Sequence, residues 1–307
     1  MSRVLVLTDG KAGHENQSRA FARALGSEFD VVPVRFKSGF HKTLSYALDR
    51  LGVRTQRLFS VDGDIAPGMY DAVIGTGSGT FYAAKALARR LGVKCGVVLY
   101  PRGYALHGFD CILAPSFDRP AKAPNVIEIP ANLVAADESF YETGEAEFRR
   151  RHADTGRKAV AVIVGGPNRR STMTPEWMRM QLDAIFAGRG DAEMWITTSR
   201  RTPLDVEAVV DSYPWDYKLI YSRDRFNPIP AFVKLADRLY VTAESTGMLS
   251  EACTFGSAEV SALDNLVPGK HKFRRFLDGL SAGGYVGGRR KIDLSVQFSA
   301  AKAMLGL

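Results

Sequence analysis

The sequence predicts an α/β fold of two Rossmann-like lobes with parallel sheets and an interdomain cleft. Short β-branched runs alternate with helical patterns almost from end to end, which is typical of β-α-β units and a buried parallel sheet. A polar, charge-rich stretch over 137–157, which is typical of a helix plus a linker, divides this alternation into two series. Two such lobes create a cleft between the carboxyl ends of their sheets, where open α/β folds bind ligands.

The first lobe is expected to cover residues 1–156. Its strands are apolar, β-branched runs, and its helices show apolar residues at helical spacing. The predicted strands are 4–8, 31–35, 72–76, 96–100, 111–114 and 126–129. The predicted helices are 16–25, 41–51 and 80–91.

The second lobe is expected over 157–290 and repeats the architecture without repeating the sequence. Its predicted strands are 159–164, 193–198, 218–221, 238–241 and 258–261. Its predicted helices are 175–186, 204–211 and 245–255. The last segment, 291–307, has a helical apolar pattern, and we expect it to pack back across the first lobe.

Length and composition agree with this organisation. A chain of 307 residues favours two domains, and 46% hydrophobic with 24% charged residues is ordinary for a globular protein. The longest apolar stretches are strand-sized, far short of a membrane-spanning helix. The N-terminus meets Thr8-Asp9-Gly10 at once, which leaves no room for a signal peptide, so we expect a cytoplasmic protein.

The three cysteines, Cys95, Cys111 and Cys253, lie beside apolar runs and have no C-x-x-C spacing. This pattern favours buried, reduced thiols over a disulfide or zinc framework. We therefore expect no structural metal.

The charge balance of 41 Lys and Arg against 33 Asp and Glu gives a net charge of +8. Such a balance favours anionic partners, namely nucleotide phosphates, acidic lipid surfaces or nucleic acid, although a merely soluble surface is the alternative. The basic clusters 270–275 and 289–291 lack the interleaved aromatic residues of a base-stacking platform, which argues against nucleic acid. The same clusters could attract an anionic membrane, and peripheral membrane contact is a second expectation.

The loop after the first predicted strand reads Thr8-Asp9-Gly10-Lys11-Ala12-Gly13-His14-Glu15-Asn16-Gln17. It enters a helix whose N-terminal amides are free to hold an anion, and Lys11 adds a positive charge. It is neither a Walker A loop nor an H-E-x-x-H zinc motif. A glycine-rich turn in which Asn16 caps the helix is the alternative.

The loop after the third predicted strand, Gly75-Thr76-Gly77-Ser78-Gly79-Thr80, lets backbone approach a ligand closely. It is a weak dinucleotide fingerprint, because its spacing is G-x-G-x-G and the next strand ends without an acidic residue. Tight packing of a helix on a strand is the alternative. As candidate acceptor-side residues we take Gly75, Gly77, Ser78 and Gly79.

Two strands of the second lobe end in polar and glycine residues: Gly165, Gly166 and Asn168 after the first, and Ser199, Arg200 and Arg201 after the second. Pro203 suits the first turn of the following helix, which would put both arginines at the carboxyl edge of the sheet. A guanidinium there can hold phosphate oxygens in a bidentate manner. Solvated surface arginines are the alternative.

The stretch 241–252 carries a fourth candidate. Ser245 and Thr246 are plausible helix caps before Gly247, and Glu251 falls in the second turn among apolar residues. A carboxylate there needs a partner. It could be a ribose diol, which donates two hydrogen bonds to one carboxylate, or an arginine in a buried salt bridge.

Together these motifs resemble one family, the bacterial relatives of the plant mitochondrial-fission (elongated-mitochondria) protein. The similarity covers nearly the whole chain and rests on the stretches 9–17, 165–167, 198–203, 227–228, 236–237, 241–252 and 272–276. The family resembles GT-B glycosyltransferases, notably the lipid-linked N-acetylglucosaminyltransferases of cell-wall synthesis. In that fold the second lobe holds the nucleotide-sugar donor and a helix glutamate binds the ribose, which is the position that Glu251 matches.

Two positions depart from the family pattern. Many relatives carry Pro-x-His-Asp where this chain has Pro115-Ser116-Phe117-Asp118, and Glu244 stands where Asp is usual. A role for the missing histidine cannot be transferred to this chain, and the choice of donor or acceptor could differ.

The leading hypothesis is metal-independent and cofactor-independent transfer of a sugar from a nucleoside-diphosphate sugar to an acceptor hydroxyl of a glycan or lipid-linked acceptor, in cell-envelope glycan synthesis. His14 is the candidate base, with Glu15 and Asp9 behind it. Lys11 and Gly13 join the second-lobe residues as candidate donor contacts. The alternative is a non-catalytic recruitment scaffold on the same fold. An NAD-dependent epimerase is disfavoured because no Tyr-x-x-x-Lys occurs.

Overall fold

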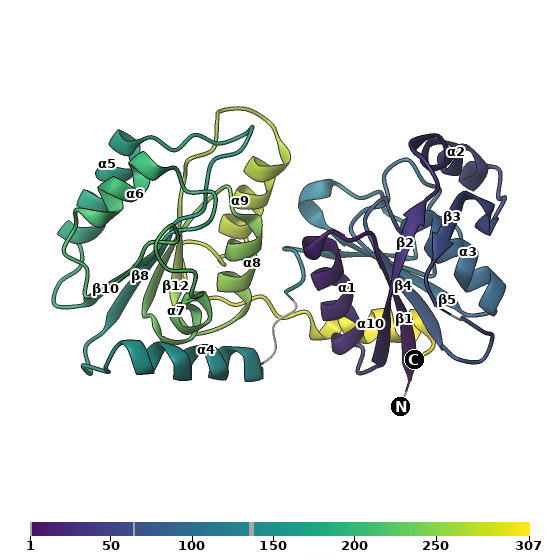
Figure 1. Ribbon diagram of the computed structural model, residues 1–307, viewed down its shortest axis with the longest axis horizontal. Coiled ribbons are helices and arrows are strands. Elements are labelled where there is room, and N and C mark those ends of the chain that lie inside the picture. The colour runs from purple at the N-terminus through teal and green to yellow at the C-terminus, as the bar shows by residue number, and fades with distance from the viewer. Residues whose placement is uncertain (1, 64, 135–137) are drawn as a thin grey trace. The chain divides into compact units, whose positions relative to one another are not determined.

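The computed structural model describes residues 2–63, 65–134 and 138–307, which form two compact units (Figure 1). Unit 1 consists of Met1–Ala135 and Asp293–Leu307, and unit 2 of Ala136–Ile292. The division falls after residue 135, earlier than the sequence predicts. The reason is that helix α4 (Glu138–Arg151) packs on α7 (Ile229–Leu235) and so belongs to unit 2.

Unit 1 is built on a seven-stranded sheet of order β3-β2-β1-β4-β5-β6-β7, in which only β3 runs antiparallel to its neighbour. Parallel pairing puts Val4 of β1 opposite Phe29 of β2 and Ala72 of β4. The strands are β1 (Arg3–Thr8), β2 (Glu28–Phe36), β3 (Phe59–Val61), β4 (Ala72–Thr76), β5 (Lys94–Val98), β6 (Cys111–Pro115) and β7 (Val126–Ile129).

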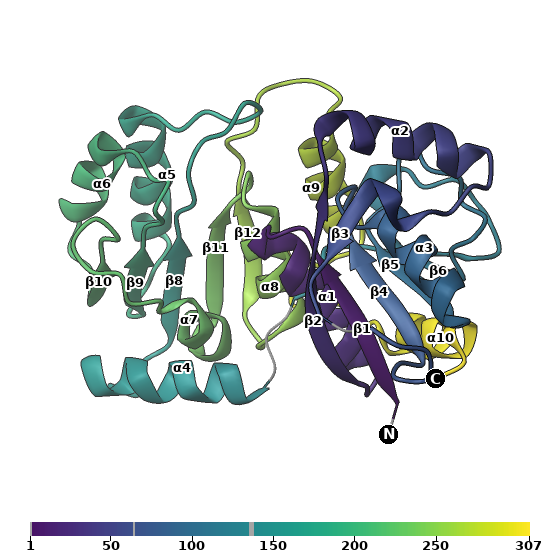
Figure 2. The same cartoon turned by 45° about the vertical axis from the view of Figure 1, so that its right-hand side comes forward.

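Helices cover both faces of this sheet (Figure 2). α2 (Gly39–Arg50) and α3 (Phe81–Leu91) pack on one face, and α1 (Ala12–Ala24) and α10 (Ser295–Leu305) pack on the other. The 3₁₀ turns η1 (Gln56–Leu58) and η2 (Ser116–Asp118) complete the unit. The C-terminal segment thus lies on unit 1, where the sequence places it.

Unit 2 holds a five-stranded, wholly parallel sheet of order β10-β9-β8-β11-β12. Its strands are β8 (Ala159–Ile163), β9 (Glu193–Thr197), β10 (Tyr217–Leu219), β11 (Arg238–Thr242) and β12 (Glu259–Leu263). α5 (Pro175–Ala187) and α6 (Leu204–Asp211) form a core with β8 and β9. α8 (Thr246–Thr254) lies against β11 and β12, and α9 (Lys272–Ala282) follows β12 in the chain. The predicted class of two Rossmann-like lobes with parallel sheets is confirmed.

Local chemistry explains several element boundaries. α5 begins after Thr174, whose hydroxyl accepts a hydrogen bond from the Trp177 amide, and Pro175 occupies the first helical position. α3 ends at Gly92, whose φ of 72° is a left-handed conformation that glycine adopts without a steric penalty.

α1 begins at Ala12, earlier than the predicted start at residue 16. Lys11, not Asn16, occupies the position before the helix, so the prediction that Asn16 caps it is wrong. Gly13, His14 and Glu15 therefore lie on the first turn of a helix instead of in a loop. This places the His14 side chain at the carboxyl edge of the sheet, beside the end of β1.

All three cysteines are free and buried. Burial raises the pKa of both Cys111 and Cys253 to about 12, so these thiols stay protonated at neutral pH. Across the described part of the chain, none of the helices combines the length and the apolar content that crossing a bilayer requires.

Candidate functional site

Unit 2 contains a cavity of about 450 Å³ at the carboxyl edge of its sheet. It lies where the loops after β8, β9 and β11 meet. The residues around it are Asn168, Arg169, Arg170, Arg201, Glu244, Ser245, Thr246, Gly247 and Phe273.

Three arginines give this cavity a strongly positive lining. Arg169 and Arg170 come from the loop after β8, and Arg201 comes from the loop after β9. All three are exposed, and none of their guanidinium groups forms an ion pair with a described residue. Uncompensated guanidinium groups around a concavity favour a phosphate-bearing ligand.

The N-terminus of α8 adds hydrogen-bond donors to the same cavity. Ser245, Thr246 and Gly247 line it, and the amides of Thr246 and Gly247 donate to none of the described residues. The Ser245 side chain does not cap the helix. A helix start with free amides and a positive dipole end binds anions, which adds to the effect of the arginines.

Gly165 and Gly166 allow the loops to close around the cavity. A Cβ on Gly165 would lie 2.1 Å from Glu244 Oε1, and a Cβ on Gly166 would lie 2.2 Å from the carbonyl oxygen of Arg201. Thr202 joins the loops further, since its hydroxyl lies 2.6 Å from the Gly165 carbonyl oxygen and accepts a hydrogen bond from the Ser199 amide. The close packing of these loops therefore requires glycine at both positions, which the Gly-Gly sequence alone does not show.

Glu244 is a buried carboxyl group in the cavity wall, with only 2% of the residue exposed. It accepts hydrogen bonds from Thr242 Oγ1 at 3.0 Å and from Asn265 Nδ2 at 2.8 Å. Burial raises the pKa of Glu244, and the hydrogen bonds from Asn265, Thr242 and the Gly166 amide partly oppose that rise. The Thr242 hydroxyl also accepts from the Gly165 amide, so Glu244 and Thr242 together hold the glycine loop.

Glu251 lies in the second turn of α8 and is not among the residues that line the cavity. The phenol of Tyr141 donates a hydrogen bond to its Oε1 at 3.0 Å. Tyr141 is 2% exposed, and its ring packs on Phe255 with a centroid separation of 4.5 Å. The partner of this carboxylate is thus a tyrosine from α4, where the sequence suggested a ribose or an arginine.

The sequence-predicted residues of unit 2 divide into two groups. Gly165, Gly166, Asn168, Arg201, Ser245, Thr246 and Gly247 come together at the cavity. Ser199 and Arg200 do not line it. Sequence reasoning missed Arg169, Arg170 and Phe273, although two arginines directly after a Gly-Gly-Pro-Asn loop were a readable signal.

Unit 1 brings the first and second glycine-containing loops together around an Asp-His pair. His14 Nδ1 lies 3.1 Å from each carboxylate oxygen of Asp9. With Nδ1–H donating to Asp9, the Nε2 atom is left with a free lone pair, which is the arrangement of a general base. Burial raises the pKa of Asp9, but His14 and Lys11 outweigh this effect and hold the pKa below its usual value, so the carboxylate is charged at neutral pH.

Gly77 and Gly79 provide the surface on which this pair packs. A Cβ on Gly77 would lie 2.3 Å from His14 Cε1, and a Cβ on Gly79 would lie 2.5 Å from Asp9 Cβ. Gly77 also has a φ of 82°, which disfavours any side chain. Of the other predicted residues in this loop, Gly75 packs against Thr80, and the Ser78 carbonyl oxygen accepts a hydrogen bond from Tyr104 Oη at 3.4 Å.

The remaining candidates of the first loop are also in unit 1. Lys11 Nζ lies 3.4 Å from Asp9 Oδ2, and its side chain is 64% exposed. Glu15 forms an ion pair with Arg19 at 2.8 Å and does not contact the Asp9–His14 pair through any hydrogen bond of the described residues. A Cβ on Gly13 would have no atom of the described residues within 4 Å.

Solved structures with a similar fold include three sugar-nucleotide enzymes. A putative UDP-N-acetylglucosamine 2-epimerase from Listeria monocytogenes matches with a TM-score of 0.52 and 13% identity, covering 99% of this chain and 91% of that one. The UDP-GlcNAc 2-epimerase of Methanocaldococcus jannaschii matches with a TM-score of 0.52 and 13% identity, covering 96% of this chain and 95% of that one. The UDP-GlcNAc 2-epimerase of Neisseria meningitidis, bound to UDP-GlcNAc, matches with a TM-score of 0.50 and 13% identity, covering 99% of this chain and 98% of that one. At these identities the similarity establishes the fold alone.

A comparison with curated proteins finds no match. The family model described as mitochondrial fission ELM1, in contrast, matches residues 12–292. This match covers most of both units, including His14 of unit 1 and the whole cavity of unit 2, whereas Asp9 and Lys11 lie just before its first residue. The chain therefore belongs to the mitochondrial fission ELM1 family.

Proposed function

We propose that the protein transfers a sugar from a nucleoside-diphosphate sugar to an acceptor hydroxyl, without a metal ion or a cofactor. The observation that carries the proposal is the cavity of unit 2, where three unpaired arginines and the free amides of α8 surround a space of about 450 Å³. Charge-assisted hydrogen bonds from these groups can stabilise a diphosphate, both as a ligand and as the leaving group. The similar structures support a sugar nucleotide as the ligand, because one of them contains UDP-GlcNAc.

In this proposal Glu251 accepts hydrogen bonds from the ribose hydroxyls, as the family resemblance implies. Tyr141 occupies only one position on one carboxylate oxygen, and an ionised carboxylate has about four lone-pair sites. Glu251 therefore has the capacity to accept two further hydroxyl groups.

We assign the removal of the acceptor proton to His14, with Asp9 holding its tautomer. The acceptor hydroxyl would donate to Nε2, and the proton would move to that nitrogen as the new glycosidic bond forms and the diphosphate leaves. Glu15 is not needed for this role because it is engaged by Arg19.

Binding and chemistry can be tested separately. Isothermal titration of the protein with UDP, GDP, ADP, CDP and UDP-GlcNAc should identify a ligand. Arg201→Ala should then weaken its binding about 10-fold to 100-fold, since a hydrogen bond to a charged group contributes about 1.5–3 kcal/mol. Arg225→Ala, an exposed arginine of unit 2 outside the cavity, is the control. If no nucleotide binds the wild type, the donor assignment is wrong.

His14→Gln should leave that affinity unchanged and slow the release of nucleoside diphosphate from the sugar nucleotide by about 10² to 10⁴. Glu15→Gln should change neither quantity. Equal rates for wild type and His14→Gln would remove the base from the proposal.

Two other outcomes have specific support. Conversion of a sugar nucleotide to its epimer without an acceptor would indicate an epimerase, the activity named for the three similar structures. Complete absence of nucleotide binding, with a phenotype that depends on surface residues, would favour the non-catalytic recruitment scaffold, since the family's description names mitochondrial fission and no reaction.

A further inference from the structure

We propose that the outer face of helix α2 in unit 1 docks on an anionic lipid bilayer. Phe40 in the first turn of α2 is 72% exposed, and Leu51, which follows the helix directly, is 75% exposed. Eleven residues complete about three helical turns, so these two side chains project from the same side of the helix, with exposed Ala47 between them. Two large apolar side chains aligned on an exposed helix face are typical of interfacial helices.

The opposite side of α2 supplies the contacts of this helix with the core of unit 1, so the exposed apolar residues on its outer face are not needed for that packing. Leu44 and Leu48 pack into the core of unit 1, and Ser45 and Asp49 are fully buried. Helix α2 is therefore already anchored through one side. The apolar residues on the other side have no packing partner within unit 1 that buries them.

The surroundings of this face are strongly basic. Between residues 35 and 57 there are six basic residues and a single acidic one, Asp49. Asp49 is buried and engaged by Lys85 and Arg54, so it does not offset the exposed charge. None of the other five basic residues forms an ion pair with a described residue, and the segment has no exposed acidic residue, so its exposed charge is +5. These five residues are Arg35, Lys37, Lys42, Arg50 and Arg57.

The basic clusters that the sequence singled out lack the apolar component, because none of the large apolar side chains exposed among the described residues lies within 270–275 or 289–291. Arg274 forms a bidentate ion pair with Asp264. The side chains of Arg289, Arg290 and Lys291 donate to backbone carbonyl oxygens of unit 2. The α2 face combines unpaired positive charge with exposed large apolar side chains, which is the combination that anionic lipid surfaces select.

This inference does not depend on sugar transfer, and the two proposals can fail independently. Co-sedimentation with vesicles of phosphatidylcholine alone, and of phosphatidylcholine with one third phosphatidylglycerol, tests it directly. We expect binding to the anionic vesicles only, and weaker binding when salt rises from about 0.1 M towards 1 M, where the Debye length falls to about 3 Å.

Paired variants separate the two contributions. Lys37→Gln with Arg50→Gln should lower the affinity for anionic vesicles about 25-fold, at about fivefold per basic residue. Phe40→Ser with Leu51→Ser should abolish the binding that persists at high salt. Titration with UDP should give the same affinity for all of these variants, because none of the changed residues lies in unit 2.

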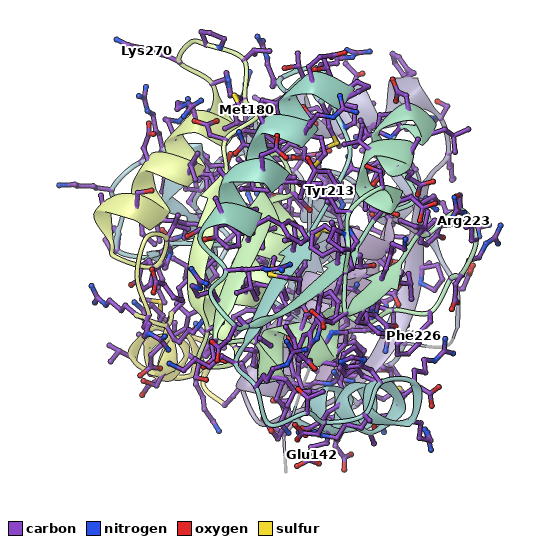
Figure 3. The ribbon with its side chains drawn as sticks, turned by 90° about the vertical axis from the view of Figure 1, so that its left-hand side faces the viewer. Glu142, Met180, Tyr213, Arg223, Phe226 and Lys270 are labelled. Carbon is purple, nitrogen blue, oxygen red and sulfur yellow. The ribbon has the colours of Figure 1, made fainter. Side chains whose placement is uncertain are left out.

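Matched controls come from unit 2, where Met180 is 58% and Leu204 is 74% exposed and where Lys270 extends from its loop (Figure 3). Met180→Ser with Leu204→Ser, and Lys270→Gln with Arg225→Gln, should leave vesicle binding unchanged. In Phe40→Trp, the tryptophan emission should shift to the blue when anionic vesicles are added. The proposal is overturned if the wild type ignores anionic vesicles, if the control pairs reduce binding as much as the α2 pairs, or if competing RNA binds α2 more tightly than the vesicles do.

Discussion

Tyr141 fixes the orientation of the Glu251 carboxylate. Its phenol is buried, and Glu251 Oε1 is its hydrogen-bond acceptor at 3.0 Å. Burial and the neighbouring Glu251 carboxylate both raise the pKa of Tyr141, so the phenol stays protonated and remains a donor at neutral pH. In the proposed function, Tyr141 is a positioning residue that acts through Glu251.

Tyr141→Phe keeps the ring on Phe255 and removes only the hydroxyl. We expect binding of a nucleoside diphosphate to weaken about fivefold, as the loss of one ordinary hydrogen bond of about 1 kcal/mol implies. Binding of inorganic pyrophosphate should not change, because it lacks the ribose. Titration calorimetry with both ligands measures the difference. Tyr213→Phe, which removes the hydrogen bond from Tyr213 to Asp183, is the control, and an equal loss for pyrophosphate would contradict the assignment.

Gly165 tolerates no side chain. Its missing Cβ would lie 2.1 Å from Glu244 Oε1 and 3.0 Å from Thr242 Oγ1, and both atoms belong to the buried hydrogen-bond network of the cavity wall. Gly165→Ala should therefore lower the free energy of unfolding by about 1–3 kcal/mol, the usual cost of overpacking. Urea titration of the two proteins gives this value.

The control for Gly165 is Gly279, which lies inside α9 with no atom near its absent Cβ. Gly279→Ala should stabilise the protein by about 0.5–1 kcal/mol, because alanine favours the helical backbone. Equal effects for the two substitutions would show that contact with Glu244 does not limit position 165.

At the scale of elements, the C-terminal end of α4 is attached to the amino edge of the unit 2 sheet. His152 Nε2 lies 3.0 Å from Glu193 Oε2, and Trp195 Nε1 donates to the same oxygen at 2.8 Å. Burial raises the pKa of Glu193, but hydrogen bonds from Thr155, His152 and Trp195 outweigh it and hold the pKa below its ordinary value of 4.5.

The sign of this shift gives a pH dependence. A carboxyl with a lowered pKa in the folded state contributes stability above pH 4.5, and the contribution disappears as the pH falls through the folded-state pKa. Glu193→Gln should lower the free energy of unfolding by about 1–3 kcal/mol at neutral pH, the cost of a weakened buried network, and the difference should shrink on acidification. Glu142→Gln, on the exposed side of α4 (Figure 3), should change neither value. A difference that stays constant with pH would contradict this account.

Elements with strong periodicity were predictable from the sequence. The predicted strands 72–76 and 126–129 and the helix 204–211 coincide with β4, β7 and α6. Three elements were missed for physical reasons. β3 has only three residues, α7 contains Pro230 in its first turn, and α9 opens with the basic run Lys272-Phe273-Arg274-Arg275, which hides its apolar side.

The candidate site was predictable where a glycine-rich loop follows an apolar strand. That rule identified the loops of His14, Gly77 and Gly165, and the helix-cap residues Ser245 and Thr246 identified the loop before α8. It could not show that Tyr141, 110 residues before Glu251 in the chain, would engage that carboxylate, because such a contact depends on how α4 packs. The same limit applies to Phe273, which comes from α9.

At the scale of the whole molecule, each unit has its own core, and unit 1 is completed by the last segment of the chain. Ala301 and Leu305 of α10 are buried against β5, β6 and β7, and Leu305 packs over Gly96. Both ends of the described chain lie in unit 1 (Figure 1).

Removing residues 293–307 should therefore expose the α10 side of the unit 1 sheet and leave unit 2 intact. We expect the thermal transition of unit 1 to move to lower temperature or to vanish, while a nucleoside diphosphate binds with the affinity of the full chain. Differential scanning calorimetry with and without the nucleotide tests both parts. Leu305→Ala should also lower the transition temperature of unit 1, by a smaller amount. A loss of nucleotide affinity in either variant would contradict the independence of unit 2.

The position of α10 also sets the order in which the protein can mature on the ribosome. Every residue of unit 2 is synthesised before α10 emerges, whereas the sheet of unit 1, started first, must wait for that helix to cover Val98 of β5 and Leu113 of β6. Domains usually mature from the N-terminus onwards. Here unit 2, which is translated in the middle, can acquire its native core before unit 1 is complete. A translation product that stops before α10 would therefore contain a folded unit 2 and a unit 1 whose apolar sheet face is exposed to chaperones.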